Sequence, residues 1–210
     1  EQAEAYYTRC LEASERSLGL EHPDTNNTRC FLANLLSDQR RYSKSIPLHR
    51  QEWSIAEQRD GRNAPGTLSS LNQLAIDLRE TGELEEAETL FRELLEARRQ
   101  VLKPIDFGIG RALGGLAKTI EEAGRLEEAA AIAQQTLDHR HEHEGPDSWW
   151  TNRNRLDLAR VLQKLGRDAE ALPLLEQLQA SLGNLDLPDE EDRHLLASAC
   201  DLLDLITAEH

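Results

Sequence analysis

Two histidines near residue 140 are the side chains in this sequence that most resemble a metal site. In the segment HRHEHEG, His139 and His143 are four residues apart and would share one helix face, with Glu142 and Glu144 nearby. A structural zinc site usually has four ligands, so two more would have to come from elsewhere. Histidines in a last helical turn also complement the helix dipole. We prefer this second interpretation and predict no metal and no other cofactor.

Other patterns that could support catalysis have simpler explanations. The run FGIGRALGGLAK superficially suggests a phosphate loop, but it follows no strand and fits a helical pattern described below. The acidic pairs Glu85/Glu86 and Glu127/Glu128 recur at the interval of an internal repeat, which marks them as scaffold surface. The sequence contains no nucleophile elbow and no HExxH motif. We therefore predict that the protein is not an enzyme.

One basic segment contrasts with the acidic chain as a whole. The formal net charge of −15 argues against nonspecific binding to nucleic acid, which needs a basic footprint. Yet the segment 149–164 carries a local excess of three positive charges, made of Arg153, Arg155, Arg160 and Lys164 against Asp157. Arginines suit bidentate contacts with carboxylates of a partner. The alternative is a solvated helix face whose arginines pair with acidic residues of other helices.

An interval of 42 residues organises the chain that carries these side chains. Similar phrases (DQRRYSKSIPL, ETGELEEAETLF, EAGRLEEAAAIA and KLGRDAEALPLL) place four residues in one column, here named the turn column: Arg40, Gly82, Gly124 and Gly166. A loop column at the same interval contains Gly19, Gly61, Lys103 and Gly145. A period of about 20–50 residues is typical of solenoids built from stacked supersecondary units.

Apolar residues have helical spacing on both sides of the turn column. Before it, in a segment we name helix A, Leu-Ala pairs recur at Leu32, Leu74, Leu116 and Leu158. After it, in helix B, alanines recur at Ala87, Ala129 and Ala171. Alanine is expected where the two helices of a hairpin cross closely, so larger residues there would overpack the crossing.

These residues resemble the tetratricopeptide repeat (TPR), in the 42-residue variety of kinesin light chains. The resemblance rests on EHPDT at residues 21–25, the Leu-Ala pairs, and the phrases GELEEAETLF and GRLEEAAAIA. It implies an all-α, right-handed superhelical solenoid of antiparallel helix hairpins, with a concave groove that binds extended peptides. Kinesin light chains carry paired asparagines before the Leu-Ala step, but here only Asn72 is kept, beside Gln73. The resemblance therefore does not imply the same cargo.

The repeat divides residues 1–210 into one array. We expect the following segments: 1–18 as helix B of a truncated repeat, 19–60, 61–102, 103–144 and 145–186 as repeats 1 to 4, and 187–210 as helix A of a truncated or capping repeat. The array starts inside a helix B and stops after a helix A, so we expect both ends to be cut from a longer protein. The absence of methionine agrees with this at the beginning of the chain.

The face of helix A opposite the Leu-Ala pairs is expected to line the groove, which would change from neutral to basic along the array. The residues predicted to contact a peptide or partner domain are Asn27, Phe31, Asn34, Asn72, Gln73, Arg111, Gly115, Lys118, Arg153, Asp157, Arg160 and Lys164. Gly115 either admits a ligand backbone or packs tightly against a neighbouring helix. Trp149 is expected to pack over the hairpin entrance, and Trp150 is expected to be exposed as a binding anchor.

The last helix breaks the repeat pattern, because Asp201 and Asp204 occupy columns that hold alanine and leucine elsewhere. Its apolar surface should cover a missing segment or form a homodimer. We expect no membrane-spanning segment, since there is no apolar run of about 18 residues. The odd number of cysteines, three, fits a reducing compartment and a cytoplasmic location.

The sequence thus predicts a non-catalytic interaction scaffold that binds a peptide or partner domain. The alternative is a regulatory, sensor or oligomerisation arm of a larger signalling protein such as a kinase or NTPase.

Overall fold

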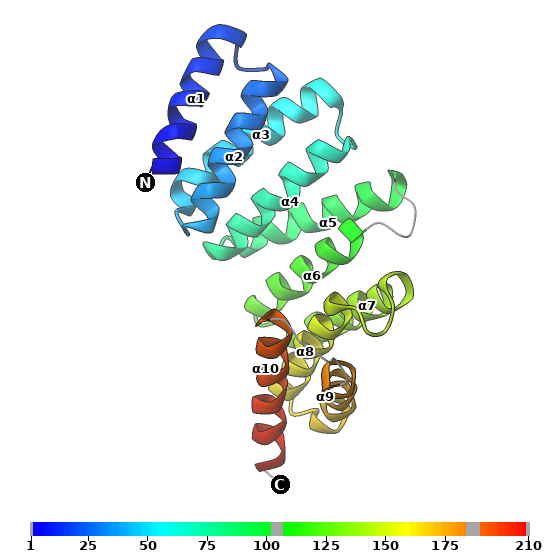
Figure 1. Ribbon diagram of the computed structural model, residues 1–210. Helices are drawn as coiled ribbons and strands as arrows, with labels where there is room; N and C mark the ends of the chain where they lie inside the picture. Colours follow the sequence, from blue (N-terminus) through cyan, green and yellow to red (C-terminus); the bar gives the residue numbers. More distant parts are fainter. Residues whose placement is uncertain (1, 102–106, 184–189, 209–210) are drawn as a thin grey trace. The chain divides into compact units, whose positions relative to one another are not determined.

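The structure, a computed structural model, describes residues 2–101, 107–183 and 190–208. Within these ranges the chain forms ten α-helices, α1 to α10 (Figure 1). Contacts divide it into two compact units, Glu1–Lys103 and Pro104–His210. Unit 1 contains α1 to α5 and unit 2 contains α6 to α10, and each unit is described by itself below.

Helix boundaries recur every 42 residues, so the predicted helices A and B are confirmed. The A helices are α2 (Pro23–Asp38), α4 (Pro65–Glu80), α6 (Phe107–Glu122) and α8 (Trp149–Lys164). The B helices are α3 (Tyr42–Asp60), α5 (Leu84–Val101), α7 (Leu126–Glu144) and α9 (Asp168–Gly183). The outermost helices are α1 (Gln2–Leu18) and α10 (Glu190–Ala208). The run FGIGRALGGLAK lies in α6, as the helical pattern predicts.

Each hairpin turn uses the same hydrogen bond to end its A helix. The second residue after the helix-ending cap donates its N–H to a carbonyl five positions earlier: Arg41 to Leu36, Glu83 to Leu78, Arg125 to Ile120 and Arg167 to Leu162, at 2.9–3.1 Å. The preceding turn-column residue has a positive φ, which glycine adopts easily. Arg40 is the exception, with φ 57°.

The apolar columns form the core of both units. The leucines of the Leu-Ala pairs are buried, as are the alanines that follow them and the alanines of the B helices. In unit 1, successive helices from α1 to α5 pack on one another. In unit 2, α7 packs on α6, α8 packs on α7 and α9, and α10 packs on both α9 and α8. These contacts bury the A and B helices against each other, as expected for hairpins.

A buried polar motif, here named the Asn–Arg clamp, fastens the loop before two of the A helices. It consists of Asn26 and Arg29 with the carbonyl of Leu20, and of Asn152 and Arg155 with the carbonyl of Pro146. The guanidinium lies 2.8 and 2.6 Å from the asparagine oxygen in the two copies. Arg155 is therefore part of the scaffold, and burial lowers its pKa.

Helix α10 does not keep the register of the earlier A helices. Its buried residues are Leu195, Ala199, Leu202 and Ile206, whereas the repeat would place the core at residues 200, 201 and 204. Asp201 and Asp204 are exposed, so the rotation keeps both carboxylates in solvent. Cys200 is only half-buried as a result.

Candidate functional site

One face of α8, here named the basic face, presents four charged side chains at helical spacing: Arg153, Asp157, Arg160 and Lys164. These side chains are between 41% and 54% exposed. Separations of three and four residues place them on one side of the helix. The helix begins at a cap in which the Ser148 hydroxyl accepts the Thr151 N–H at 3.1 Å.

The ion pairs of the basic face lie within α8 or run to α6, another A helix, rather than to B helices. Arg153 Nε lies 3.3 Å from the Asp157 carboxylate, and Arg160 Nη1 lies 3.9 Å from it. Lys164 Nζ lies 2.7 Å from Glu121 on α6. Asp157 is shared by two arginines, so it neutralises only part of their charge.

The Asp157 carboxyl is the member of this face whose ionisation is perturbed. Burial raises its pKa, although Arg153, Arg160 and Lys118 act in the opposite direction. Its side chain is 41% exposed, which leaves it open to a ligand. A carboxylate brought next to it would oppose its ionisation further.

A pocket of about 200 Å³, here named the Gly114 pocket, opens between α6, α7 and α8. It is lined by Gly114, Ala117, Lys118 and Glu121 of α6, Ala133 and Thr136 of α7, and Arg153, Asn154, Asp157, Arg160 and Val161 of α8. The pocket combines an apolar wall of small residues with a charged rim.

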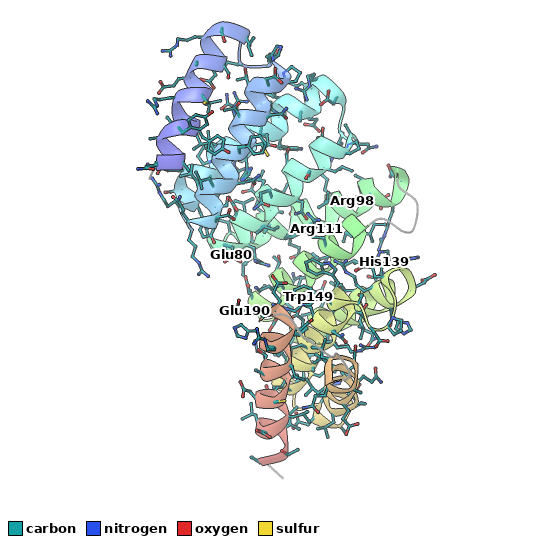
Figure 2. The ribbon with its side chains drawn as sticks, in the orientation of Figure 1. Glu80, Arg98, Arg111, His139, Trp149 and Glu190 are labelled. Carbon is teal, nitrogen blue, oxygen red and sulfur yellow. The ribbon has the colours of Figure 1, made fainter. Side chains whose placement is uncertain are left out.

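A second pocket of about 420 Å³, here named the Trp149 pocket, lies between α8 and α10. Its lining residues are Trp149, Arg153, Leu156, Arg160, Glu191, His194, Leu195 and Ser198. Trp149 and Glu190, labelled in Figure 2, mark the starts of these two helices. Arg153 and Arg160 line both pockets, so the two hollows meet at the basic face.

The predicted site residues of unit 1 have varied surroundings. Asn27 and Phe31 are exposed, and the Phe31 ring stacks on Tyr7 at 6.0 Å. Asn34 is half-buried and donates to the sulfur of Cys30, a thiol whose pKa burial raises to about 12.

Asn72 and Gln73 are held within unit 1. Asn72 is only 4% exposed, which removes it from the surface that a ligand can reach. Gln73 is half-buried and its amide lies 3.5 Å from Asp77. Asn72 therefore lies in the interior of unit 1, and Gln73 lies partly within it.

The predicted residues of α6 lie near the Gly114 pocket but do not all line it. Arg111 and Lys118 are exposed, and Lys118 is part of the rim. Gly115 is half-buried, and the pocket is lined by Gly114 instead. Gly115 therefore stays a predicted groove residue, and its neighbour Gly114 lines the pocket.

Trp150 is 50% exposed, as predicted, and is part of a cluster at the start of α8. Its ring lies 4.6 Å from that of Trp149, and the Arg140 guanidinium lies 5.1 Å above it. Arg140 is buried and pairs with Glu144. A Cβ at Gly110 would come within 2.5 Å of Arg140 Nε, so this glycine makes room for the arginine.

A second concentration of titratable side chains is buried in unit 1, and the sequence analysis missed it. This group, here named the Asp77 cluster, contains Ser37, Ser45, His49, Glu52, Ser70 and Asp77. Ser45 and Ser37 donate to Asp77 at 2.5 and 2.7 Å. His49 lies 3.1 Å from Glu52, which also accepts from Ser70 at 2.6 Å.

Within the Asp77 cluster, Ser37, His49 and Glu52 are arranged like a catalytic triad. Ser37 Oγ lies 3.3 Å from His49 Nε2, and His49 Nδ1 lies 3.1 Å from Glu52. All six side chains are buried, so a substrate cannot reach the hydroxyl. We therefore interpret these side chains as a structural hydrogen-bond network inside unit 1. One signal in the sequence is Ser45, which stands where Ala87, Ala129 and Ala171 stand in the later repeats.

The histidines of α7 face each other rather than a set of ligands. The His139 and His143 rings are in edge contact with centroids 4.5 Å apart. Among the described residues, histidine, cysteine, aspartate and glutamate side chains do not form a group of three that could hold a metal ion. The described helices also include none that is long and apolar enough to cross a membrane.

Several solved structures share this fold. A putative kinesin light chain with nearly identical TPR-like repeats from Podosopora anserina has a TM-score of 0.76 at 20% identity, over 89% of each chain. BtubC from P. vanneervenii has a TM-score of 0.74 at 14% identity, over 98% of this chain and 88% of that one. The Rap conjugation gene regulator of plasmid pLS20, solved with a bound peptide, has a TM-score of 0.73 at 18% identity. The match covers 99% of this chain but 54% of the regulator.

These likenesses show a TPR-like helical repeat fold. No curated protein matches the chain by sequence. Family models of the tetratricopeptide repeat match residues 1–24, 25–100, 110–135 and 155–177, which together make up more than half of the sequence. With its 42-residue helix hairpins, the chain belongs to the tetratricopeptide repeat family.

Proposed function

We propose that this chain is a non-catalytic scaffold whose unit 2 binds an acidic peptide, or an acidic segment of a partner domain, across the basic face of α8. The observation that carries the proposal is that Arg153 and Arg160 line two adjoining pockets while sharing one carboxylate. Guanidinium groups in this state have donors left for carboxylates of a ligand. The net charge of −15 supports a protein partner over nucleic acid.

The test begins with a selection of nine-residue peptides from a random phage-displayed library on the 210-residue chain. A selected peptide labelled with fluorescein is then titrated by fluorescence anisotropy. We expect acidic peptides, and a loss of affinity of about tenfold or more in Arg153→Glu and Arg160→Glu. Arg167→Glu is the matched control, because Arg167 is similarly exposed but lies outside both pockets. Equal affinities in all these variants would exclude the basic face as the binding surface.

A regulatory arm of a larger protein is the second candidate function. Its support is the likeness to the Rap regulator. The match covers 99% of this chain but only 54% of the regulator, which therefore contains a further part. In this case peptide binding at the basic face would regulate another part of the larger protein. Peptide binding that changes the oligomeric state of a longer chain, measured by light scattering, would distinguish it from a simple scaffold.

Two smaller proposals concern assembly and location. We assign self-association to α10, where Leu205 is 47% exposed, and expect Leu205→Glu to convert a dimer to a monomer in sedimentation experiments. We also propose a cytoplasmic location, which the three free thiols support. Fractionation of cells that contain the tagged protein would test it.

A further inference from the structure

His49 of the Asp77 cluster lies between two buried carboxyl groups. Its Nδ1 lies 3.1 Å from Glu52, and its Nε2 lies 3.7 Å from Asp77. The side chains of His49, Glu52 and Asp77 are 0%, 7% and 1% exposed. Two carboxylates buried together need a positive charge beside them, because water cannot stabilise them there. The imidazole ring is placed to supply that charge.

Both nitrogens of the His49 ring face hydrogen-bond acceptors. Nδ1 faces the Glu52 carboxylate, which can only accept. Nε2 lies 3.3 Å from the Ser37 hydroxyl. The single proton of that hydroxyl has two other acceptors, the Asp77 carboxylate at 2.7 Å and the Ala33 carbonyl at 3.0 Å, so a lone pair is left for the ring. A neutral imidazole donates from one nitrogen, whereas an imidazolium donates from both.

Two other titratable side chains beside the cluster do not supply the positive charge. Cys30 of α2 lies next to Glu52, and burial raises the pKa of this thiol to about 12. Tyr42 of α3 lies near Asp77, and burial raises the pKa of its phenol. Both groups are therefore neutral in the pH range where histidine titrates, and neither of them carries a positive charge in any state.

Two buried arginines of unit 1 form ion pairs with other carboxylates. Arg29 lies 3.1 Å from Glu15, and Arg79 pairs with Glu80. The Asp77 cluster itself contains no lysine or arginine. Free histidine binds a proton about 2 pH units more readily than free glutamate or aspartate. The imidazole is therefore the group of the cluster that holds the proton.

We propose that His49 is a buried imidazolium and that its proton is a pH-sensitive lock on unit 1. Ser37 of α2, Glu52 of α3 and Asp77 of α4 surround the ring, so three successive helices share this proton. When the ring loses it, both carboxylates stay buried without a cation and the helices separate more easily. The lock lies in unit 1 and does not depend on the proposed binding at α8.

The sign of the pH effect follows from the charge of the ring. Below about pH 6.5 the histidine of the unfolded chain is protonated as well, so the stability from the lock is fully present. Above this pH the unfolded chain loses its proton while folded unit 1 keeps it. The stability is therefore lost as the pH rises, until the folded ring also becomes neutral.

The protonation state of the ring can be read from the nitrogen chemical shifts of the histidines. Long-range nitrogen–proton spectra of the wild-type chain at about pH 7.5 should show both His49 nitrogens protonated, and His49→Gln identifies these signals by their loss. We expect the folded ring to keep its proton to a pH at least about one unit higher than histidine in the urea-unfolded chain. A bare nitrogen at about pH 7.5 would overturn the proposal.

The effect on stability is measured with Trp53 of α3, which is the only tryptophan left in a chain with Trp149→Phe and Trp150→Phe. Urea unfolding followed by its fluorescence should give a folding equilibrium constant that falls up to about tenfold for each pH unit above about 6.5. His49→Gln should lose this slope, because glutamine binds no proton. His141→Gln, which changes an exposed histidine of α7, is the matched control and should keep it.

A wild-type slope in His49→Gln would show that another group controls the response, and the lock would be rejected. If that variant does not fold, Glu52→Gln replaces it, because the carboxamide keeps the size of the side chain and removes one charge. His49 should then lose its proton at a pH at least about one unit lower than in wild type. An unchanged titration of the ring in Glu52→Gln would also overturn the proposal.

Discussion

The Asp77 cluster of unit 1 lies inside the helix hairpins, whereas the basic face of unit 2 lies on the surface of α8 and in the pockets beside it. Asp77 and Asp157 illustrate the difference, since both are aspartates on A helices. Asp77 accepts from two buried serines, while Asp157 is 41% exposed and pairs with two half-exposed arginines. An aspartate on an A helix is thus part of the buried structure in unit 1, whereas in unit 2 it stays accessible to a ligand.

The largest effect is expected from removing the buried aspartate. Asp77→Ala leaves Ser45 and Ser37 without their shared acceptor and removes the carboxylate 3.7 Å from His49 Nε2. We expect a loss of about 3–5 kcal/mol in the free energy of unfolding. Asp157→Ala should cost less than about 1 kcal/mol, because its ion pairs are exposed. Urea denaturation followed by circular dichroism measures both. Similar losses in the two variants would contradict the contrast between the units.

A smaller effect is expected at the turn column, where unit 1 and unit 2 differ in one residue type. Arg40 has a left-handed backbone with φ 57°, which costs a residue with a Cβ about 1–2 kcal/mol. Arg40→Gly should recover part of this energy, and Gly124→Arg should lose a similar amount in unit 2. Thermal unfolding of both variants tests the pair. A stabilised Gly124→Arg chain would show that this turn residue is not under strain.

A gain in stability is expected at Gly114. Gly114→Ala removes a glycine from the interior of α6 and should stabilise the chain by about 1 kcal/mol. Its Cβ meets only ordinary contacts, so no clash offsets the gain. Differential scanning calorimetry measures the change. A destabilised variant would show that the pocket is needed for folding and would remove the distinction between binding and packing residues in unit 2.

The smallest effect concerns the pH dependence of acidic ligand binding. Burial raises the pKa of Asp157, so in the range above its ordinary value the folded protein holds more protons than the unfolded chain. The stability from this group is therefore present at low pH and is lost as the pH rises through the raised pKa. Ionised Asp157 also opposes an acidic peptide, so affinity should fall over the same range.

Asp157→Asn should remove that slope and raise the affinity for an acidic peptide about two- to fivefold near neutral pH, an effect the size of one exposed ion pair. Anisotropy titrations at several pH values compare the variant with wild type. Glu170→Gln is the control, because Glu170 pairs with Arg167 and lines neither the Gly114 pocket nor the Trp149 pocket. Parallel pH profiles for wild type and Asp157→Asn would show that another group controls the response.

The repeated columns made the helices predictable, because each column samples the same environment several times. Leu74, Ala75 and Gly82 follow the pattern, and their burial or turn geometry agrees with it. The Gly114 pocket could not be predicted in the same way, since it depends on side chains from three helices that converge on one glycine. Helix α10 also departs from the repeat register, and the departure keeps Asp201 and Asp204 in solvent.

Residues that differ from the repeat columns were the best guide to candidate sites. The sequence did not reveal whether each of them faces the core or the solvent. Asn72 illustrates this, because the resemblance to kinesin light chains places it among the peptide-binding residues while the structure buries it. The members of the Asp77 cluster are up to 40 residues apart in the chain, so their contacts become visible only in three dimensions.

The Asn–Arg clamp has a consequence for how such an array can grow. Its carbonyl and its arginine are nine positions apart in the sequence, and the asparagine lies between them in both copies. A repeat in a solenoid contacts mainly its immediate neighbours. A hairpin with this clamp therefore brings with it the residues that hold its preceding loop in place. Gene duplication or deliberate grafting can insert it elsewhere in an array without rebuilding the loop that precedes it.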